Sequence, residues 1–249
     1  MKIEKIQVFG FEASLRGMRN AYDSWDKGDS FFGENSGWGA MPIDPPWGHY
    51  DTAPELPEIG PNDLKLALQL IKRGAPHRKF LRQIIIWVDL TLPRYVWTEM
   101  DTQKVGTVRL SCSTMHTLGK CLLVQEDFEE PLTEETLDEL NALVAAFQRE
   151  GVPAETKKLH RKIKNHLPEG FLQKSTFMMS YEVALSILKW RHKHQLPEWN
   201  YKNPNSICSF ILRLPYMKDF AMAALEGALI SLDRREDSVD NGLDSDSPS

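Results

Sequence analysis

The spacing of apolar residues predicts alternating strands and helices in the first third of the chain. Residues 2–9 alternate loosely between polar and apolar side chains, which predicts a strand. Residues 11–25 carry apolar side chains at helical spacing and predict a helix. A second helix is predicted from residue 63 to a stop at Gly74, with Asn62 as its N-terminal cap.

The middle of the chain continues this alternation. Residues 83–92 are β-branched and apolar, a pattern typical of a central strand that is buried on most of its surface. Pro93 predicts the start of a helix, because its missing N–H costs nothing there. Residues 107–114 form a second strand-like stretch, and Thr133 is the expected cap of a helix that ends at Gly151.

After a basic helix over residues 154–166, the run 167–191 predicts an apolar helix that ends at Arg191. An arginine at the end of a buried helix must find an anion or reach water, because burying it unpaired is costly. Arg191 is therefore a candidate ligand-binding residue. The alternative is that this helix has no ligand-binding role. Its apolar residues would then form an ordinary core stripe, and residues 191–194 would be a solvated basic end that suits the dipole at the helix C-terminus.

Residues 26–61 are rich in Gly, Pro and aromatic side chains, too apolar for a solvated linker. They predict an ordered loop, such as a lid or an oligomer contact. A Pro/Asn loop and an amphipathic helix over residues 215–232 close the body of the chain. With no regular βαβ repeat and no G-x-G-x-x-G, the pattern predicts an α+β fold with a mixed sheet flanked by helices, in one domain of residues 1–232.

Composition and charge narrow the classes of partner. The chain has 249 residues, 41% of them hydrophobic, and a formal net charge of −5. The tail of residues 233–249 holds six acids against two arginines, so it carries −4 and the body only −1. A near-neutral body gives no general attraction for nucleic acid, whereas a local site for a small anion stays possible. The tail is expected to be solvated and disordered.

Three cysteines without C-x-x-C spacing predict free thiols in a reducing compartment, and hence a cytoplasmic location. No apolar run is long enough to cross a bilayer, so no membrane partner is expected. The seven histidines show no H-E-x-x-H pattern, which makes a structural metal site improbable.

Several polar residues are candidates for ligand contacts. Arg94 follows a buried strand, a usual place for ligand contacts in mixed α/β domains. Ser111 and Ser113, in the run SCSTMH, could donate hydrogen bonds to a phosphate or simply satisfy the end of a strand. His77 lies between two predicted helices and, taken alone, fits a loop histidine better than a catalyst.

The order of these pieces resembles the flavin-dependent thymidylate synthases. Arg19, Tyr22 and Ser24 in MRNAYDS match that family's a-x-R-x-c-Y-x-S segment, and His77 matches its flavin-contacting histidine. Arg94 follows His77 at close to the family spacing. The late motif resembles the family best. In the family an L-P pair precedes the arginine that binds the nucleotide, and here the pair at residues 167–168 precedes Arg191 at a similar distance.

The sequence also departs from the family pattern. The flavin signature R-H-R-x-x-S falls on residues 102–104, where only Lys104 keeps a charge. The Asn and Arg of the late motif are replaced by Ser180 and Glu182. Lost arginines remove bidentate contacts that Lys or Thr cannot reproduce.

The resemblance implies an α+β domain in a homotetramer whose active sites are built from several chains. It implies FAD as cofactor, with NADPH and methylenetetrahydrofolate as co-substrates, and a dUMP-type pyrimidine nucleotide as substrate. Arg191, Arg94, Ser111 and Ser113 would contact the nucleotide, as would Glu99, which stands where the family has Gln. His77, Lys104 and Ser180 would contact the flavin.

Three functional classes follow from these observations. The first is a flavin-dependent thymidylate synthase or close relative. The second is a nucleotide-binding relative that has lost the flavin, and the third is an oligomeric structural or interaction protein that uses the aromatic loop and the acidic tail. Flavin absorbance and nucleotide binding distinguish them.

Overall fold

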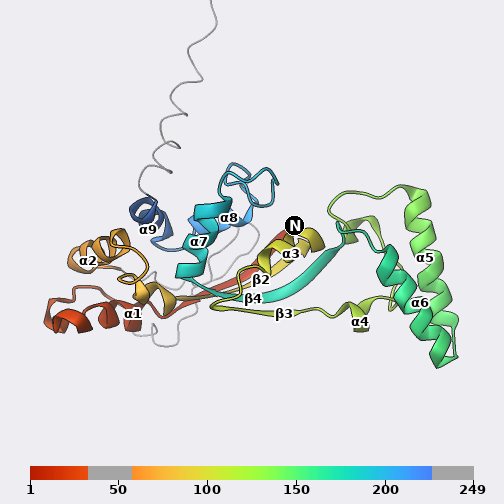
Figure 1. Ribbon diagram of the computed structural model, residues 1–249, viewed down its shortest axis with the longest axis horizontal. Coiled ribbons are helices and arrows are strands. Elements are labelled where there is room, and N and C mark those ends of the chain that lie inside the picture. Colours follow the sequence, from red (N-terminus) through yellow and green to blue (C-terminus); the bar gives the residue numbers. More distant parts are fainter. Residues whose placement is uncertain (33–57, 226–249) are drawn as a thin grey trace, which may run out of the picture. The chain divides into compact units, whose positions relative to one another are not determined.

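The computed structural model of the protein describes residues 1–32 and 58–225. Contacts divide the chain into two units, which we describe separately (Figure 1). The sheet unit comprises, among these residues, Met1–Phe9 and Ile85–Val183. The helical unit comprises residues 10–32, 58–84 and 184–225. The single domain over residues 1–232 stays a prediction, as does the disordered tail, which lies outside the described residues.

The sheet unit is built on four strands in the order β1 (Lys2–Phe9), β2 (Ile85–Pro93), β4 (Leu172–Ser180) and β3 (Thr107–Ser111). Every pairing between these strands is antiparallel, so the predicted mixed sheet is wrong while the α+β class is confirmed. The physical reason is visible in β2, where burial alternates along the strand and Trp87 is 37% exposed. A sheet with one solvated face is typical of antiparallel pairing.

Strand β4 corrects the predicted helix over residues 167–191. Residues 172–180 are extended, and only α7 (Tyr181–Arg191) is helical. Ser175, Phe177 and Met179 are buried while the residues between them are more exposed, the two-residue period of a strand. Because β4 pairs with β2 on one side and β3 on the other, its backbone hydrogen bonds are satisfied only in the extended form.

Local signals located the other elements of the sheet unit well. Pro93 ends β2 and is the N-cap of α3 (Arg94–Met100), close to the predicted helix start. The predicted strand over residues 107–114 is shorter, because Ser113 instead caps the short helix α4 (Thr114–Thr117) by accepting the Met115 N–H.

Helices α5 (Glu134–Arg149) and α6 (Pro153–His166) lie side by side as a hairpin (Figure 1). Thr133 caps α5 as predicted, its hydroxyl accepting the Thr136 N–H. The hairpin packs on a cluster of buried apolar side chains supplied by both helices and the flanking loops: Leu118, Leu123, Phe128, Leu140, Val144, Ile163 and Leu167. This small core is built almost entirely from sequence-local residues.

The helical unit contains α1 (Phe11–Met18), α2 (Pro61–Lys72), the 3-10 helix η3 (Lys79–Arg82), α8 (Ile207–Leu212) and α9 (Met217–Ala224), together with most of α7. Predicted helix α2 is confirmed, but its cap is not Asn62. Gly60 is the N-cap, and Asp29 accepts the N–H groups of Asn62 and Asp63 at 2.9 and 3.0 Å. A residue distant in sequence therefore satisfies the free amides of this helix start.

The remaining predictions for this unit are met in part. Gly74 follows α2 with a φ of +90°, the conformation that a glycine after a helix end supplies. Described residues end within the predicted final helix, of which α9 covers Met217–Ala224. Most of the predicted aromatic loop, residues 33–57, lies outside the described residues. Within residues 1–32 and 58–225, no helix has the length and apolarity needed to cross a membrane.

Candidate functional site

Arg191 is the last residue of α7, and the packing of that helix decides where its guanidinium lies. Tyr181, Ala184, Leu185, Ile187 and Leu188 are each at most 2% exposed, whereas Lys189 and Trp190 are exposed. Arg191 itself is half-buried. The predicted arginine at the end of a buried helix is therefore present, although the helix is shorter than predicted.

Two aromatic side chains from the loop after α7 contact the Arg191 guanidinium. Its carbon lies 5.3 Å from the ring centroid of Trp199, which is only 1% exposed. Its Nη1 lies 3.0 Å from Nε2 of His194. A guanidinium over a buried indole is attracted by the ring face and is held in a defined orientation.

The loop itself is fixed by hydrogen bonds around this arginine. Asn200 donates to the carbonyl of His194 at 2.9 Å, and the Tyr201 N–H donates to the carbonyl of His192 at 3.0 Å. The Leu196 N–H lies 3.2 Å from Nδ1 of His194, so both ring nitrogens of this histidine face donors. A neutral imidazole accepts at one nitrogen only, so an oxygen acceptor placed here would relieve one of the two contacts.

Two ring nitrogens in the same loop are buried without a hydrogen-bond partner among the described residues. They are Nε2 of His192, whose Nδ1 contacts the Leu188 carbonyl at 2.8 Å, and Nε1 of Trp199. Burying an unpaired donor or acceptor costs about 1–3 kcal/mol. Such atoms are commoner where a ligand or an ordered water completes the site.

Cys208 in α8 is a fully buried thiol in this neighbourhood. Burial raises the pKa of Cys208 to about 12, although the charge of Arg191 opposes that rise. Because the thiolate is the reactive form, Cys208 is not a nucleophile in the folded protein.

We expect alkylation to separate the three cysteines. Cys112 and Cys121 are exposed and free, so iodoacetamide should modify both in the native protein at about pH 8. Cys208 should react only after unfolding in urea, giving two adducts before denaturation and three after, as counted by intact mass. Native labelling of Cys208 at the rate of the other two would contradict its burial.

The sheet unit holds six of the predicted site residues, and three of them lie near α3. Arg94 donates from Nη1 to the Leu167 carbonyl at 3.1 Å and pairs through Nη2 with Glu169 at 3.3 Å. Glu99 is half-buried on the same helix, and Lys104 is exposed in the turn that follows it. The Arg94–Glu169 ion pair is partly solvated, so it contributes little to fold stability. An anionic ligand could therefore take the place of Glu169.

The three predicted serines have different environments. Ser111 is exposed at the end of β3, opposite Ser175 of β4. The Ser113 hydroxyl caps α4. This is a structural role, the kind of alternative to a phosphate contact that the sequence left open for Ser113. Ser180 is 4% exposed, and its hydroxyl accepts the Val183 N–H at 3.4 Å in the first turn of α7. Only Ser111 presents an exposed hydroxyl.

His77 belongs to the helical unit, like Arg191, and is exposed in the turn after α2. Its N–H donates to the carbonyl of Gly74 at 3.0 Å. The assignment of His77 to a flavin stays a prediction.

Arg109 of β3 is a half-buried polar residue that sequence reasoning missed. Its guanidinium carbon lies 3.8 Å from the Trp97 ring centroid, and its nitrogens donate to Asp101 at 2.9 Å, Gln173 at 3.0 Å and Ser175 at 3.1 Å. Burial lowers the pKa of the Arg109 guanidinium, while Asp101 acts in the opposite direction. Each nitrogen of the Arg109 guanidinium has an acceptor within the sheet unit. Arg109 therefore holds β3 against β4 and the end of α3. The available sequence signal for Arg109 was its position in β3, where exposure alternates between successive residues.

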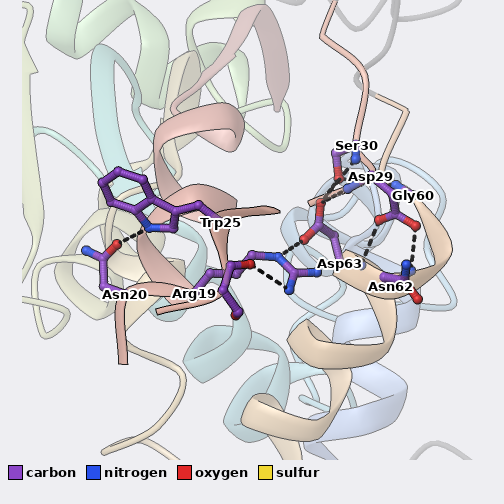
Figure 2. A network of polar contacts seen from close by, with 9 residues as sticks. Arg19, Asn20, Trp25, Asp29, Ser30, Gly60, Asn62 and Asp63 are labelled. Carbon is purple, nitrogen blue, oxygen red and sulfur yellow. Dashed lines mark hydrogen bonds and ion pairs between the residues drawn. The ribbon is translucent and has the colours of Figure 1, made fainter. Parts of the chain in front are cut away.

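Arg19, from the segment that resembles the family's first motif, forms a buried ion pair with Asp63 of α2 (Figure 2). Its Nε donates to Asp63 Oδ1 at 2.6 Å, and both side chains are about 5% exposed. Asp63 Oδ2 accepts the Ser30 hydroxyl at 2.6 Å and the N–H groups of Asp29 and Ser30 at 3.2 and 3.1 Å. Asp63 therefore anchors both Arg19 and residues 29–30 on α2. No local sequence signal identifies Asp63 as the partner of Arg19.

The Asp63 environment predicts a specific loss of stability in acid. Burial alone would raise the pKa of its carboxyl, but the hydrogen bonds from Ser30, Arg19 and Asp29 and the charge of Arg19 outweigh that effect and lower it. A carboxyl with a lowered pKa stabilises the fold above its unfolded pKa, about 4, and this contribution is lost as pH falls through the folded-state pKa.

We therefore expect the stability difference between wild type and Asp63→Asn to shrink below about pH 4. Urea unfolding of both proteins across a pH series measures that difference directly. A difference that stays constant down to the lowest pH would show that the Asp63 charge contributes nothing.

In residues 1–32 and 58–225, no three His, Cys, Asp or Glu side chains lie together as a metal site would require.

No protein-family model matches the sequence, and no curated protein matches it by sequence. The fold does match solved structures, and two of them are flavin-dependent thymidylate synthases. ThyX from Helicobacter pylori complexed with FAD and dUMP matches with a TM-score of 0.55 and 14% identity, over 93% of this chain and 97% of that one. A second ThyX structure from the same organism, also with FAD and dUMP, matches with a TM-score of 0.55 and 14% identity over 91% and 94%. The chain thus has a ThyX-like fold.

Proposed function

We propose that this protein binds a pyrimidine nucleotide of the dUMP type and that Arg191 is its principal contact. The observation that carries the proposal is the Arg191 guanidinium, half-buried at the end of α7 and oriented by Trp199 and His194. A planar guanidinium donates a fork of parallel hydrogen bonds, which suits the carbonyl-rich edge of uracil or a phosphate. The fold match adds support, because both matched ThyX structures contain dUMP.

The same residues define what the site does chemically. The Trp199 ring fixes the plane of the guanidinium, so little side-chain entropy is lost when a ligand binds. His194 and the orphan nitrogens nearby supply further polar groups for a ligand or its waters. In the sheet unit, Arg94, Glu99, Ser111 and Ser113 stay proposals as nucleotide contacts, each described within that unit alone. Ser113 is already engaged as a helix cap, and Arg94 already pairs with Glu169.

Thymidylate synthase activity is the further proposal that follows from the resemblance. In a homotetramer, a bound flavin reduced by NADPH would supply the hydride for reductive methylation of the nucleotide, and methylenetetrahydrofolate would supply the one-carbon unit. Ser180 does not fit a flavin contact, because it is buried and its hydroxyl already accepts the Val183 N–H. His77 and Lys104 are exposed, so the misfit concerns Ser180 alone among the three predicted flavin contacts, and we derive no step through a flavin.

The burial of Ser180 and its hydrogen bond to the Val183 N–H favour a second candidate function. This candidate is a flavin-free relative that binds the nucleotide without synthase activity. The two candidates share the Arg191 contact and differ only in the cofactor. An oligomeric structural or interaction protein would need neither.

Two measurements on the purified full chain test these proposals. Calorimetric titration with dUMP tests the nucleotide site, and the absorbance spectrum of the protein as isolated tests for flavin. Binding of dUMP with flavin absorbance supports the synthase, and binding without it supports the flavin-free relative. A lack of binding to dUMP and dTMP, with or without added FAD, would overturn the proposed function and leave the structural role.

A further inference from the structure

The helical unit carries a cation-rich surface that the proposed nucleotide site does not use. Between residues 64 and 88 the chain has six Lys or Arg residues and no Asp or Glu, although the whole chain is acidic. Five of the six fall within residues 72–82, and four of these are exposed: Lys72, Arg73, Lys79 and Arg82. We call residues 72–82 the basic turn.

The basic turn is compact because its backbone is tightly hydrogen bonded. The N–H groups of His77 and Arg78 both donate to the carbonyl of Gly74, and the Leu81 N–H donates to the carbonyl of Arg78. Phe80 and Leu81 are at most 5% exposed, and Ser14 of α1 donates to the Phe80 carbonyl at 2.6 Å. Burial of these apolar side chains leaves the cations between them on the surface.

Two exposed aromatic side chains on the segment of residues 20–25 are held in place, and one of them, Tyr22, contacts this turn. The Tyr22 hydroxyl accepts a hydrogen bond from Arg73 at 3.2 Å, although Tyr22 is 51% exposed. Trp25 is 62% exposed, and its Nε1 donates to Asn20 at 2.7 Å (Figure 2). Tyr22 ends the 3-10 helix η1 (Asn20–Tyr22), and Trp25 begins the next one, η2 (Trp25–Lys27), so the two rings are three residues apart in the chain. Large exposed rings fixed by hydrogen bonds are suited to stacking rather than to packing.

Acidic residues near the aromatic rings do not cancel the basic turn. Asp63 is occupied by Arg19, and Asp29 accepts two N–H groups at the start of α2. Asp23 and Asp26 remain on the surface of this segment, against the exposed cations Arg73, Lys79 and Arg82 of the basic turn. The local balance is therefore positive although the chain carries −5 overall.

We propose that the basic turn, with Tyr22 and Trp25, binds a single-stranded nucleic acid. Cations that track phosphates and aromatic rings that stack on unpaired bases are the two components of sequence-tolerant single-strand binding. A duplex would not offer its bases to exposed rings, and an acidic peptide would use the cations alone. This inference does not depend on Arg191, which is not part of the surface. The turn does contain His77, the predicted flavin contact, so the variants in the test leave His77 unchanged.

The test is fluorescence anisotropy of the full-length protein with a labelled oligo(dT) of about 15 nucleotides, repeated with oligo(U). We expect measurable binding at about 50 mM salt that weakens as salt rises. Lys79→Glu/Arg82→Glu should weaken binding at least about tenfold and reduce the salt slope by about 1.4, since each phosphate contact to a single strand contributes about 0.7. The control Lys157→Glu/Lys162→Glu makes the same charge change among the exposed lysines of α6 and should leave binding within about twofold.

The aromatic contribution has its own matched pair. Trp25→Ala should weaken binding about tenfold, because stacking of a base on an aromatic ring is lost. Trp190→Ala, which removes a tryptophan that is 70% exposed beside Lys189, should have little effect. Circular dichroism spectra and thermal midpoints establish that each variant is folded. If Lys79→Glu/Arg82→Glu is not folded, Lys79→Gln/Arg82→Gln takes its place.

Three results would overturn the proposal. They are an absence of oligonucleotide binding at about 50 mM salt, equal losses in the basic-turn and α6 variants, and competition by polyglutamate as strong as competition by oligo(dT). Loss of dUMP binding is a separate result, because it concerns Arg191 and the proposed function.

Discussion

Arg191→Ala is expected to weaken dUMP binding by about 10- to 100-fold. Hydrogen bonds to a charged group contribute about 1.5–3 kcal/mol, and every 1.4 kcal/mol is a factor of ten in affinity. The effect should approach the upper end, because the guanidinium is already oriented over Trp199 and loses little entropy on binding. Calorimetric titration of wild type and variant with dUMP measures the change.

Two further variants make this result specific. Arg213→Ala removes another arginine of the helical unit, an exposed one that donates to the Pro204 carbonyl at 2.8 Å, and should leave dUMP affinity unchanged. Arg191→Lys keeps the charge but loses the fork of donors, so its affinity should lie between those of wild type and Arg191→Ala. Unchanged dUMP affinity in Arg191→Ala, with the variant folded, would falsify the assignment of the site.

Asp63→Ala is expected to cost about 3–5 kcal/mol of unfolding free energy, because it leaves the Arg19 charge buried without its partner. It also removes the acceptor of the Ser30 hydroxyl and of two backbone N–H groups. Urea unfolding followed by circular dichroism measures the change in midpoint and slope.

A matched control exists in α9. Asp219 occupies the same third helical position there that Asp63 occupies in α2, but it is exposed. Asp219→Ala should therefore cost only the few tenths to about 1 kcal/mol that an acid near a helix N-terminus contributes. Equal losses in the two variants would mean that the buried pair adds nothing beyond the helix dipole.

A double variant separates the pair from its surroundings. Arg19→Met/Asp63→Leu removes both charges and should recover part of the stability lost in Asp63→Ala, because no buried charge is left uncompensated. Recovery should be incomplete, since the N–H groups of Asp29 and Ser30 lose their acceptor. A double variant less stable than Asp63→Ala would contradict this explanation.

The predicted site residues illustrate the limits of linear spacing. Arg191 was found because a charge after an apolar run is a local signal, and the structure keeps it at a helix end. Ser113 and Ser180 were candidates by motif position, yet each hydroxyl accepts a backbone N–H in the first turn of a helix. Which polar groups are already engaged depends on where the backbone turns, and spacing does not contain that information.

Elements with local signals can be predicted from the order of residues. The helix after Thr133, the stop at Gly74 and the change of direction at Pro93 each follow from a cap or a backbone restriction within a few residues. Tertiary structure alone decided that residues 172–180 are a strand, because their backbone groups are satisfied by β2 and β3 on opposite sides. It also decided that Arg19 meets Asp63, 44 residues away, and that Asp29 caps α2. A cap acts within one turn, whereas strand pairing and burial of charge depend on groups that only the folded chain brings together.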